Sequence, residues 1–245
     1  MIVMASPPLP WIIDAIFVVT FVLWLFLVNK DKLGESLRKL RIGAAVVLAA
    51  LLIVVTAVEL SHRAMPMISG MPCDHLVVIG DSISSGIDTR VLPWPIIMQQ
   101  MTDLPVKNLA QAGARTIDAE VMADKVNQQD LLVLIEIGGN DLLAGVPANE
   151  FAKGLETTLA KLAAPRRTLV MFELPLFPQK VAFGQTQRRL SSKYGVTLIP
   201  KRYFTAVIGK ADATSDGLHL SDAGSQSMAA LVAKILSPVL VPAAR

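Results

Sequence analysis

The chain has 245 residues, of which 53% are hydrophobic and only 18% are charged, and this composition excludes general disorder. Its net charge is +3, with no basic stripe or interleaved aromatic residues, so nucleic-acid binding is not expected. The single cysteine, Cys73, excludes an internal disulfide and a cysteine-rich metal site.

Two long apolar stretches open the chain, Trp11–Val28 with one acid and 42–58 with no charge. At about 1.5 Å per residue each gives a helix of about 26 Å, close to the ~30 Å hydrocarbon core of a bilayer. A signal peptide is disfavoured because residues 1–10 carry no Lys or Arg. A buried hairpin in a soluble protein is disfavoured because both stretches are apolar on all faces. We therefore predict a transmembrane hairpin over residues 11–28 and 42–58.

The segment between the two spans sets the expected orientation. It contains five basic residues and two acids, and the positive-inside rule then places it in the cytoplasm. Everything after residue 60 lies on the outer face, which in a double-membraned bacterium is the periplasmic side of the inner membrane. We expect residues 1–69 to form the hairpin and a tether, and residues 70–245 to form one domain. The five basic residues are Lys30, Lys32, Arg38, Lys39 and Arg41.

From residue 75 short apolar runs alternate with helical patterns, which predicts a mainly parallel α/β sheet with helices on both faces. In such a sheet ligands bind beyond the carboxyl ends of the strands. The expected strands are Leu76–Ile79, Val106–Leu109, Leu131–Ile137, Leu169–Glu173 and Val196–Ile199. The expected helices lie around 91–101, 116–127, 149–163, 180–193 and 221–236.

The first of these strands ends in Gly80-Asp81-Ser82, within HLVVIGDSISSGID. A phosphate-binding P-loop would need Lys and Ser or Thr after its second glycine, where this chain has Ile87-Asp88. The nucleophile elbow GxSxG also fails, because Ser84 occupies the position of its second glycine. Ser82 remains as a candidate nucleophile.

A serine nucleophile needs an imidazole base, and the chain has only three histidines. His62 abuts the second apolar stretch and His75 begins the first strand, at the end opposite Ser82. His219 remains, three residues after Asp216, so that one short loop can supply both a base and the acid that orients it. Taken alone, this segment is also compatible with an ordinary turn.

Acyl transfer further needs donors aimed at a developing oxyanion. The segment IEIGGND places the Asn140 side-chain amide at the end of one expected strand. The segment NLAQAGART places Gly113 after another, where a glycine lets the backbone approach a substrate closely.

Together these segments resemble the conserved blocks of the SGNH (GDSL) hydrolases over roughly residues 74–237. Gly80-Asp81-Ser82-Ile83 resembles the first block, with Ile83 in place of the usual leucine, and Asn108 with Gly113 resembles the second. Gly138–Asp141 matches the third block and Asp216–His219 the last. Within the family the chain looks closest to the small periplasmic thioesterase/lysophospholipase (arylesterase) type. The added hairpin is a departure from the simple secreted members.

The resemblance implies a three-layer α/β/α sandwich with a five-stranded parallel sheet, the flavodoxin-like SGNH fold, with no metal and no organic cofactor. It implies a triad of Ser82, His219 and Asp216 that acts through an acyl-enzyme. It implies an oxyanion hole made by the N–H groups of Ser82 and Gly113 with the Asn140 amide. We expect Asp81 and Asp141 to hold the loops rather than to take part in the chemistry.

Apolar residues near the predicted strand ends are candidates for an acyl-binding wall. Trp94, Leu142 and Leu176 are the principal candidates, and Met98, Leu143, Leu174 and Phe177 are further ones. The expected activity is that of a membrane-anchored ester hydrolase. An O-acetylesterase or acyltransferase acting on envelope polysaccharide, and a non-catalytic envelope module, remain as alternatives.

Overall fold

The structure is a computed structural model that describes residues 8–29, 34–176 and 180–241. The described chain divides into two compact units, residues 8–64 and residues 65–241.

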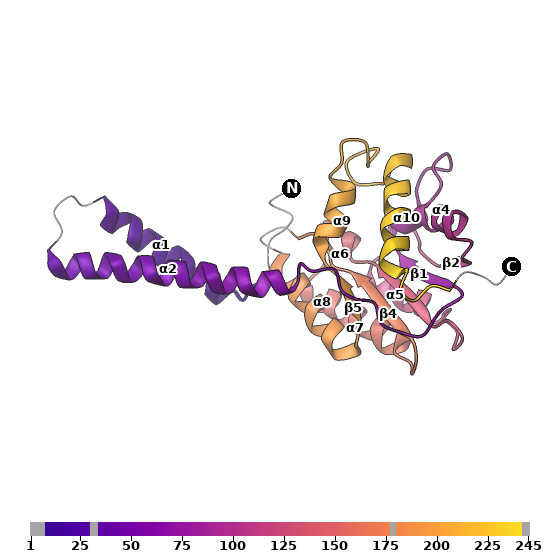
Figure 1. Ribbon diagram of the computed structural model, residues 1–245, viewed down its shortest axis with the longest axis horizontal. Helices are drawn as coiled ribbons and strands as arrows, with labels where there is room; N and C mark the ends of the chain where they lie inside the picture. The colour runs from indigo at the N-terminus through magenta and orange to yellow at the C-terminus, as the bar shows by residue number, and fades with distance from the viewer. Residues whose placement is uncertain (1–7, 30–33, 177–179, 242–245) are drawn as a thin grey trace. The chain divides into compact units, whose positions relative to one another are not determined.

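Five short parallel strands form one sheet in the second unit, in the order β2-β1-β3-β4-β5 (Figure 1). Their side chains are mostly Val, Ile and Leu, as suits strands covered on both faces. The five-stranded parallel sheet predicted from the sequence is therefore confirmed. The strands are β1 Leu76–Gly80, β2 Val106–Asn108, β3 Leu132–Glu136, β4 Thr168–Phe172 and β5 Thr197–Ile199.

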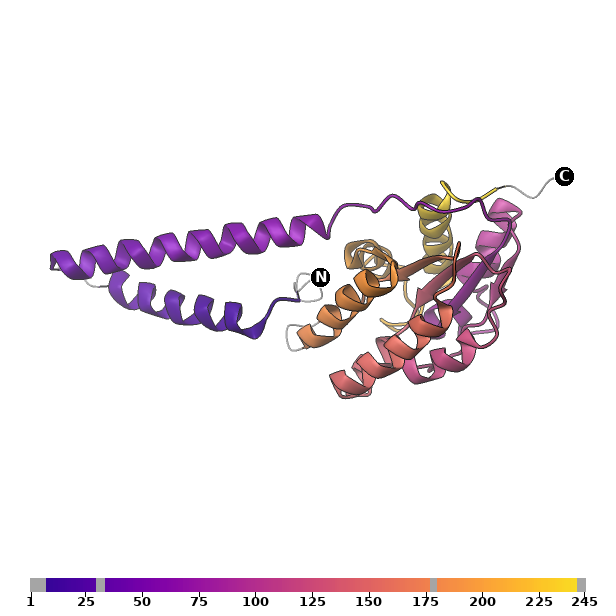
Figure 2. The same cartoon turned by 90° about the horizontal axis from the view of Figure 1, so that it is seen from below.

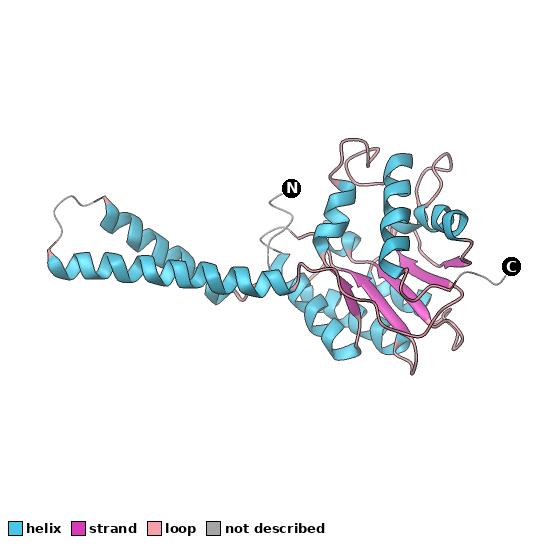
Figure 3. Ribbon diagram, viewed as in Figure 1, coloured by secondary structure: helices cyan, strands magenta, loops and turns pink. Residues whose placement is uncertain are grey.

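Helices cover both faces of this sheet and complete a three-layer sandwich (Figures 1 and 3). Alternate residues of the strands point to opposite faces of the sheet and contribute to two separate hydrophobic cores. Val78 and Leu134 pack against one set of helices, and Ile79 and Ile135 pack against the other. The first set is α4 Trp94–Thr102, α9 Lys201–Ile208 and α10 Asp222–Leu236. The second is α5 Thr116–Ala123, α7 Ala148–Leu162 and α8 Val181–Tyr194.

Helix α9 was not predicted, because it follows β5 with only Pro200 between them. Its buried Phe204 and Val207 are three residues apart and turn one face toward the sheet. Two single-turn helices, α3 Ser82–Ser85 and α6 Gly139–Leu143, follow directly on the ends of β1 and β3.

Two apolar helices, α1 Trp11–Val28 and α2 Glu35–Ser61, lie side by side in the first unit (Figures 1 and 2). Each is long and apolar enough to cross a membrane, a test that a signal sequence also passes, and only 6% of each apolar window is buried. Helix α1 has the predicted bounds. Helix α2 begins seven residues earlier than the predicted span, and Glu35 and Lys39 form an i,i+4 ion pair of 2.8 Å on its first turns.

The segment after α2 was predicted to be a tether, but part of it is bound to the second unit. Ile68 is buried in the core, and Met65 packs against it. The N–H of Cys73 donates to the carbonyl of Val239 at 2.8 Å, which ties the start of the domain to its end. Ordered packing of the α/β unit therefore begins before residue 70.

Candidate active site

The candidate site lies at the switch point of the sheet, where the strand order reverses. From β1 the chain passes to β2 on one side and returns as β3 on the other, so the carboxyl ends of β1 and β3 face a common crevice. Asp81 and Ser82 follow β1, and the segment Gly138–Asp141 follows β3.

Ser82 is held by a tight turn at the start of α3. The Asp81 carboxylate caps this helix, accepting the N–H of Ile83 at 3.0 Å. The Asn108 amide donates to the carbonyl of Ser84 at 2.9 Å and fixes the same turn from β2. At Gly80 a Cβ would meet Ser84 Oγ at 2.8 Å and the carbonyl oxygen of Glu136 at 3.0 Å, so the turn has no room for a side chain there.

Asp216 and His219 come together in the loop before α10. His219 Nδ1 lies 2.6 Å from Asp216 Oδ2, and Asp216 Oδ1 accepts the N–H groups of Leu218 and His219. These hydrogen bonds, led by that of the imidazole, hold the pKa of Asp216 well below its usual range. The acid is therefore ionised, and it fixes the orientation of the imidazole ring.

Ser82 and His219 line the same small hollow, although they are 137 positions apart in the sequence. Gly86, Pro93 and Ser225 also line it. The structure thus brings the predicted nucleophile, base and acid to one place.

Ser82 also lines a second, mostly apolar cavity of about 140 Å³. Leucines from α6, from the loop after β4 and from the loop before α10 form much of its wall, and Leu143 and Leu218 are 62% and 44% exposed. An apolar cavity beside a polar, reactive side chain is the usual form of a small-molecule site. The apolar lining is Ile83, Leu142, Leu143, Leu174, Pro175, Phe204, Ile208 and Leu218.

Asn140 lines this apolar cavity beside Ser82. Its amide donates to the carbonyl of Ala114 at 3.0 Å and, more weakly, to Asp81 Oδ2 at 3.3 Å. Gly113 sits at the turn just before Ala114 with φ +78°, a conformation that favours glycine. Gly113 is not among the residues that line the two hollows at Ser82.

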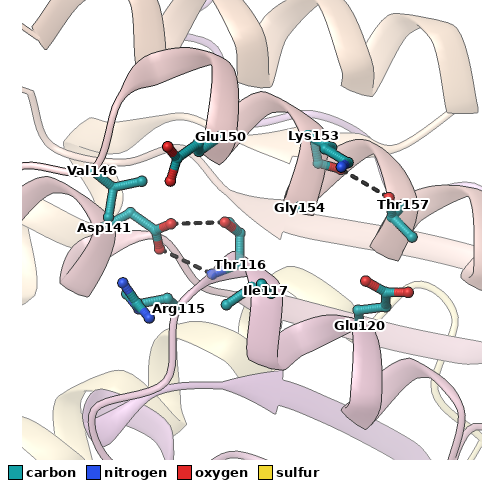
Figure 4. A pocket seen from close by; sticks show the side chains of 10 residues that line it. All are labelled: Arg115, Thr116, Ile117, Glu120, Asp141, Val146, Glu150, Lys153, Gly154 and Thr157. Carbon is teal, nitrogen blue, oxygen red and sulfur yellow. Dashed lines mark hydrogen bonds between the residues drawn. The ribbon is translucent and has the colours of Figure 1, made fainter.

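Asp141 joins the two loops that carry Asn140 and Gly113. Its carboxylate accepts the N–H of Thr116 at 3.0 Å and the Thr116 hydroxyl at 2.7 Å, as Figure 4 shows. These bonds fix the start of α5 against the start of α6, as expected for a loop-holding acid. Asp141 and Thr116 also line a separate hollow of about 300 Å³ between α5 and α7. Ser82 does not line this hollow.

Two of the three principal wall candidates lie elsewhere. Trp94 has no exposed surface, and its indole N–H donates to Ser84 Oγ at 3.2 Å inside the core. Leu176 is fully buried against α7 and α8, and Met98 is also a core residue. Leu142 lines the cavity, as do the further candidates Leu143 and Leu174, and Phe177 lies outside the described residues.

Sequence reasoning missed one residue that borders the site, Glu136, which lines the apolar cavity together with Ser82. Glu136 is the only acid in the apolar run LLVLIEIGG, two positions before Gly138, and that was the available signal.

Comparison with known proteins identifies the class of this molecule. Residues 78–226 match the model of the GDSL-like Lipase/Acylhydrolase family, which is more than half of the chain. The chain therefore belongs to this family, and it is an ester-hydrolysing enzyme.

Two characterised relatives are similar over most of their length. Esterase TesA of Pseudomonas aeruginosa is 26% identical over 188 residues, which are 67% of this chain and 89% of the relative. Thioesterase 1/protease 1/lysophospholipase L1 of Escherichia coli K12 is 25% identical over 177 residues, or 68% of this chain and 85% of the relative.

Solved structures share the fold. The crystal structure of TesA superposes with a TM-score of 0.59 at 24% identity, covering 68% of this chain and 99% of that one. The psychrotrophic esterase EstA from Pseudoalteromonas sp., inhibited by monoethylphosphonate, gives a TM-score of 0.59 at 20% identity, with 68% and 98% covered. The family match begins at residue 78, after α1 and α2.

Proposed function

We propose that this enzyme hydrolyses esters through a Ser82–His219–Asp216 triad and is anchored in a membrane by α1 and α2. The observation that carries the triad is the 2.6 Å contact between Asp216 and His219 in a loop that shares a hollow with Ser82. An oriented imidazole next to a serine is what an otherwise weak hydroxyl nucleophile requires.

In the first step His219 takes the proton of the Ser82 hydroxyl while Ser82 Oγ bonds to the ester carbonyl carbon. Asp216 stabilises the resulting imidazolium. The tetrahedral intermediate collapses when its bond to the alkoxy oxygen breaks, and His219 gives its proton to the departing alcohol. Water then attacks the acyl-enzyme by the same route, which releases the acid and restores Ser82.

The negative oxygen of each tetrahedral intermediate needs donors, which we assign to the N–H groups of Ser82 and Gly113 and to the Asn140 amide. Ser82 begins α3, where a helix leaves its first N–H groups without intrahelical partners. The 3.3 Å contact of Asn140 with Asp81 is the weaker of its two hydrogen bonds, so it is the one that a substrate oxygen would displace.

The substrate we propose is an ester with an apolar acyl group. The cavity of about 140 Å³ is mostly apolar and suits a short or medium acyl chain. Longer chains would extend over the exposed side chains of Leu143 and Leu218.

For the membrane, we propose that α1 and α2 anchor the catalytic α/β unit, which begins at about residue 65, on the outer face of a bacterial inner membrane. Support comes from the basic residues between the two spans, several of which lie on the first turns of α2. A reporter fused to the carboxyl terminus tests this orientation. Activity of an externally active reporter is expected, and a reporter active only in the cytoplasm would overturn it.

The catalytic proposal is tested with the full-length protein in detergent, beside Ser82→Ala as control. We expect turnover of p-nitrophenyl acetate and of medium-chain p-nitrophenyl esters that disappears in S82A. A phosphonate ester probe should label the wild type at Ser82 only. Turnover that survives in S82A would refute the triad. Transfer of the acyl group to an added sugar hydroxyl at the expense of hydrolysis would favour an acyltransferase instead.

A further inference from the structure

Two buried carboxyl groups lie in direct contact beneath the proposed nucleophile. The register of β1 against β3 pairs Gly80 with Glu136, so Glu136 faces the turn that begins at Asp81. The side chains of Asp81 and Glu136 share a hydrogen bond. Both residues are at most 3% exposed.

The charges around this pair do not neutralise two carboxylates. Among the described residues, neither Asp81 nor Glu136 forms an ion pair with Lys or Arg. The titratable groups that face Asp81 are Glu136, His219 and Asp141, and the one that faces Glu136 is Asp81. Two carboxylates in hydrogen-bond contact repel strongly away from water, so the pair must retain a proton.

The surrounding donors indicate which member retains it. Burial, and then the charge of Asp81, raise the pKa of Glu136 well above its usual range, and burial also raises the pKa of Asp81. Asp81 accepts hydrogen bonds from Ile83 at 3.0 Å and from Asn140 at 3.3 Å, which favour its ionised form.

A fixed chain of hydrogen bonds supports Glu136 from the core. The indole N–H of fully buried Trp94 donates to Ser84 Oγ at 3.2 Å, and the Ser84 hydroxyl donates to Glu136 Oε2 at 2.9 Å. With Oε2 accepting from Ser84, the remaining oxygen of Glu136 is available to carry the proton. The chain of contacts thus runs from α4 through Glu136 to Asp81, and from there to Ile83 and Asn140.

We propose that Glu136 is a positioning residue that acts as a neutral carboxylic acid, donating its proton to Asp81 and so fixing Ser82 for catalysis. This inference rests on the proposed triad and oxyanion hole. The hydrogen bond holds Asp81 where it caps α3, which carries Ser82. It also leaves only one negative charge beneath the site where the oxyanion forms.

The kinetic test uses the full-length protein in detergent with p-nitrophenyl acetate. Glu136→Leu removes the donor and acceptor at similar size, and we expect kcat to fall about 10- to 100-fold with KM within about threefold, as for a misplaced nucleophile. Glu136→Gln supplies an N–H donor and a carbonyl acceptor without a charge, and it should restore most of the lost kcat. Equal kcat in E136L and wild type, or a loss in E136Q as large as in E136L, would overturn the proposal.

A spectroscopic test keeps the proposal falsifiable if E136L does not fold. The infrared difference spectrum of wild type minus E136Q at neutral pH should show the carbonyl band of a protonated carboxylic acid, shifted by carboxyl-¹³C glutamate. A carboxylate band, or a band shifted only by labelled aspartate, would refute it.

Glu173→Gln is the matched control for burial. Glu173 is a buried acid whose Oε1 accepts from Arg188 at 2.7 Å. The difference spectrum of wild type minus E173Q should show a carboxylate band and no band of a protonated acid. A protonated-acid band in this control would count against both the method and the proposal. An inactive wild type would refute the proposed function, while the infrared result would still decide the protonation of Glu136.

Discussion

Two histidine–carboxylate pairs lie at opposite ends of the same sheet, and they differ in how their ring nitrogens are bonded. At the amino ends of the strands, His75 Nδ1 contacts Asp74 at 2.7 Å and His75 Nε2 contacts Asp130 at 3.0 Å. At the carboxyl ends, His219 Nδ1 contacts Asp216, and within the described residues no partner is recorded for Nε2.

This difference separates a structural imidazole from a reactive one. Both nitrogens of His75 are occupied, and Asp130 is held further by Lys107 and by the N–H of Asn127, so the cluster joins β1, β2 and the loop before β3. His219 is oriented by one carboxylate and keeps a nitrogen for proton transfer beside Ser82. A His–Asp contact by itself therefore does not mark a catalytic site.

The largest expected effect is the loss of activity when His219, but not His75, is replaced. His219→Ala should lower kcat about 10⁶-fold, because the base and its orientation are lost together. His75→Gln should keep kcat within about threefold, since it lies at the other end of the sheet. Steady-state hydrolysis of p-nitrophenyl acetate measures both. Comparable losses in the two variants would contradict the distinction between the two pairs.

The next effect concerns the oxyanion donor. Asn140→Ala should reduce kcat about 10²- to 10³-fold with a small change in KM, because the amide acts mainly in the transition state. Asn127→Ala, an exposed asparagine at the amino end of the sheet, is the matched control and should have no effect. A loss in N140A that appears only in KM would assign Asn140 to substrate binding instead.

Particular residues show how far sequence reasoning reaches. Ser82, Asp216 and His219 could be proposed from the sequence because short contiguous segments carry them, Ser82 at the end of a recognisable strand and Asp216 with His219 in one loop. Glu136 was not, because its contact with Asp81 depends on the register between β1 and β3, which pairs Gly80 with Glu136.

The interior position of Trp94 also could not be predicted from the sequence. Apolar patterning shows that a helix has a buried face, but it does not distinguish a core residue from the wall of a cavity. The start of α2 was misjudged for a related reason, since a charged sequence between two apolar spans reads as a loop although α2 begins within it and carries an ion pair there.

A smaller effect is expected at the edge of the apolar cavity. Leu143→Ser should lower kcat/KM for a medium-chain p-nitrophenyl ester about 3- to 10-fold and leave the acetate ester unaffected, because only the longer chain reaches this side chain. Val121→Ser, at a similarly exposed apolar residue on α5 that lines none of the hollows described, is the control. An equal loss on both esters would indicate a distorted site rather than a lost contact.

The smallest effect is the pH dependence of the stability that His75 provides. Burial lowers the pKa of His75, but the hydrogen bonds to Asp74 and Asp130 outweigh burial and raise it. Hydrogen bonds from Asn127, His75 and Lys107 likewise outweigh burial at Asp130 and lower its pKa. A raised folded-state pKa means that protonation favours the folded protein, so the contribution is present below the unfolded pKa of about 6.5 and is lost as pH rises through the folded value.

Urea unfolding of wild type and His75→Gln at about pH 5.5 and pH 8.5 measures this contribution. H75Q should be less stable at the lower pH by under about 1 kcal/mol, since the ring is partly exposed and solvent screens its ion pairs. The difference should shrink at the higher pH, where the wild-type imidazole has lost its charge. A difference that grows with pH would mean that His75 stabilises the fold in its neutral form, as a packed ring rather than as the cation between two acids.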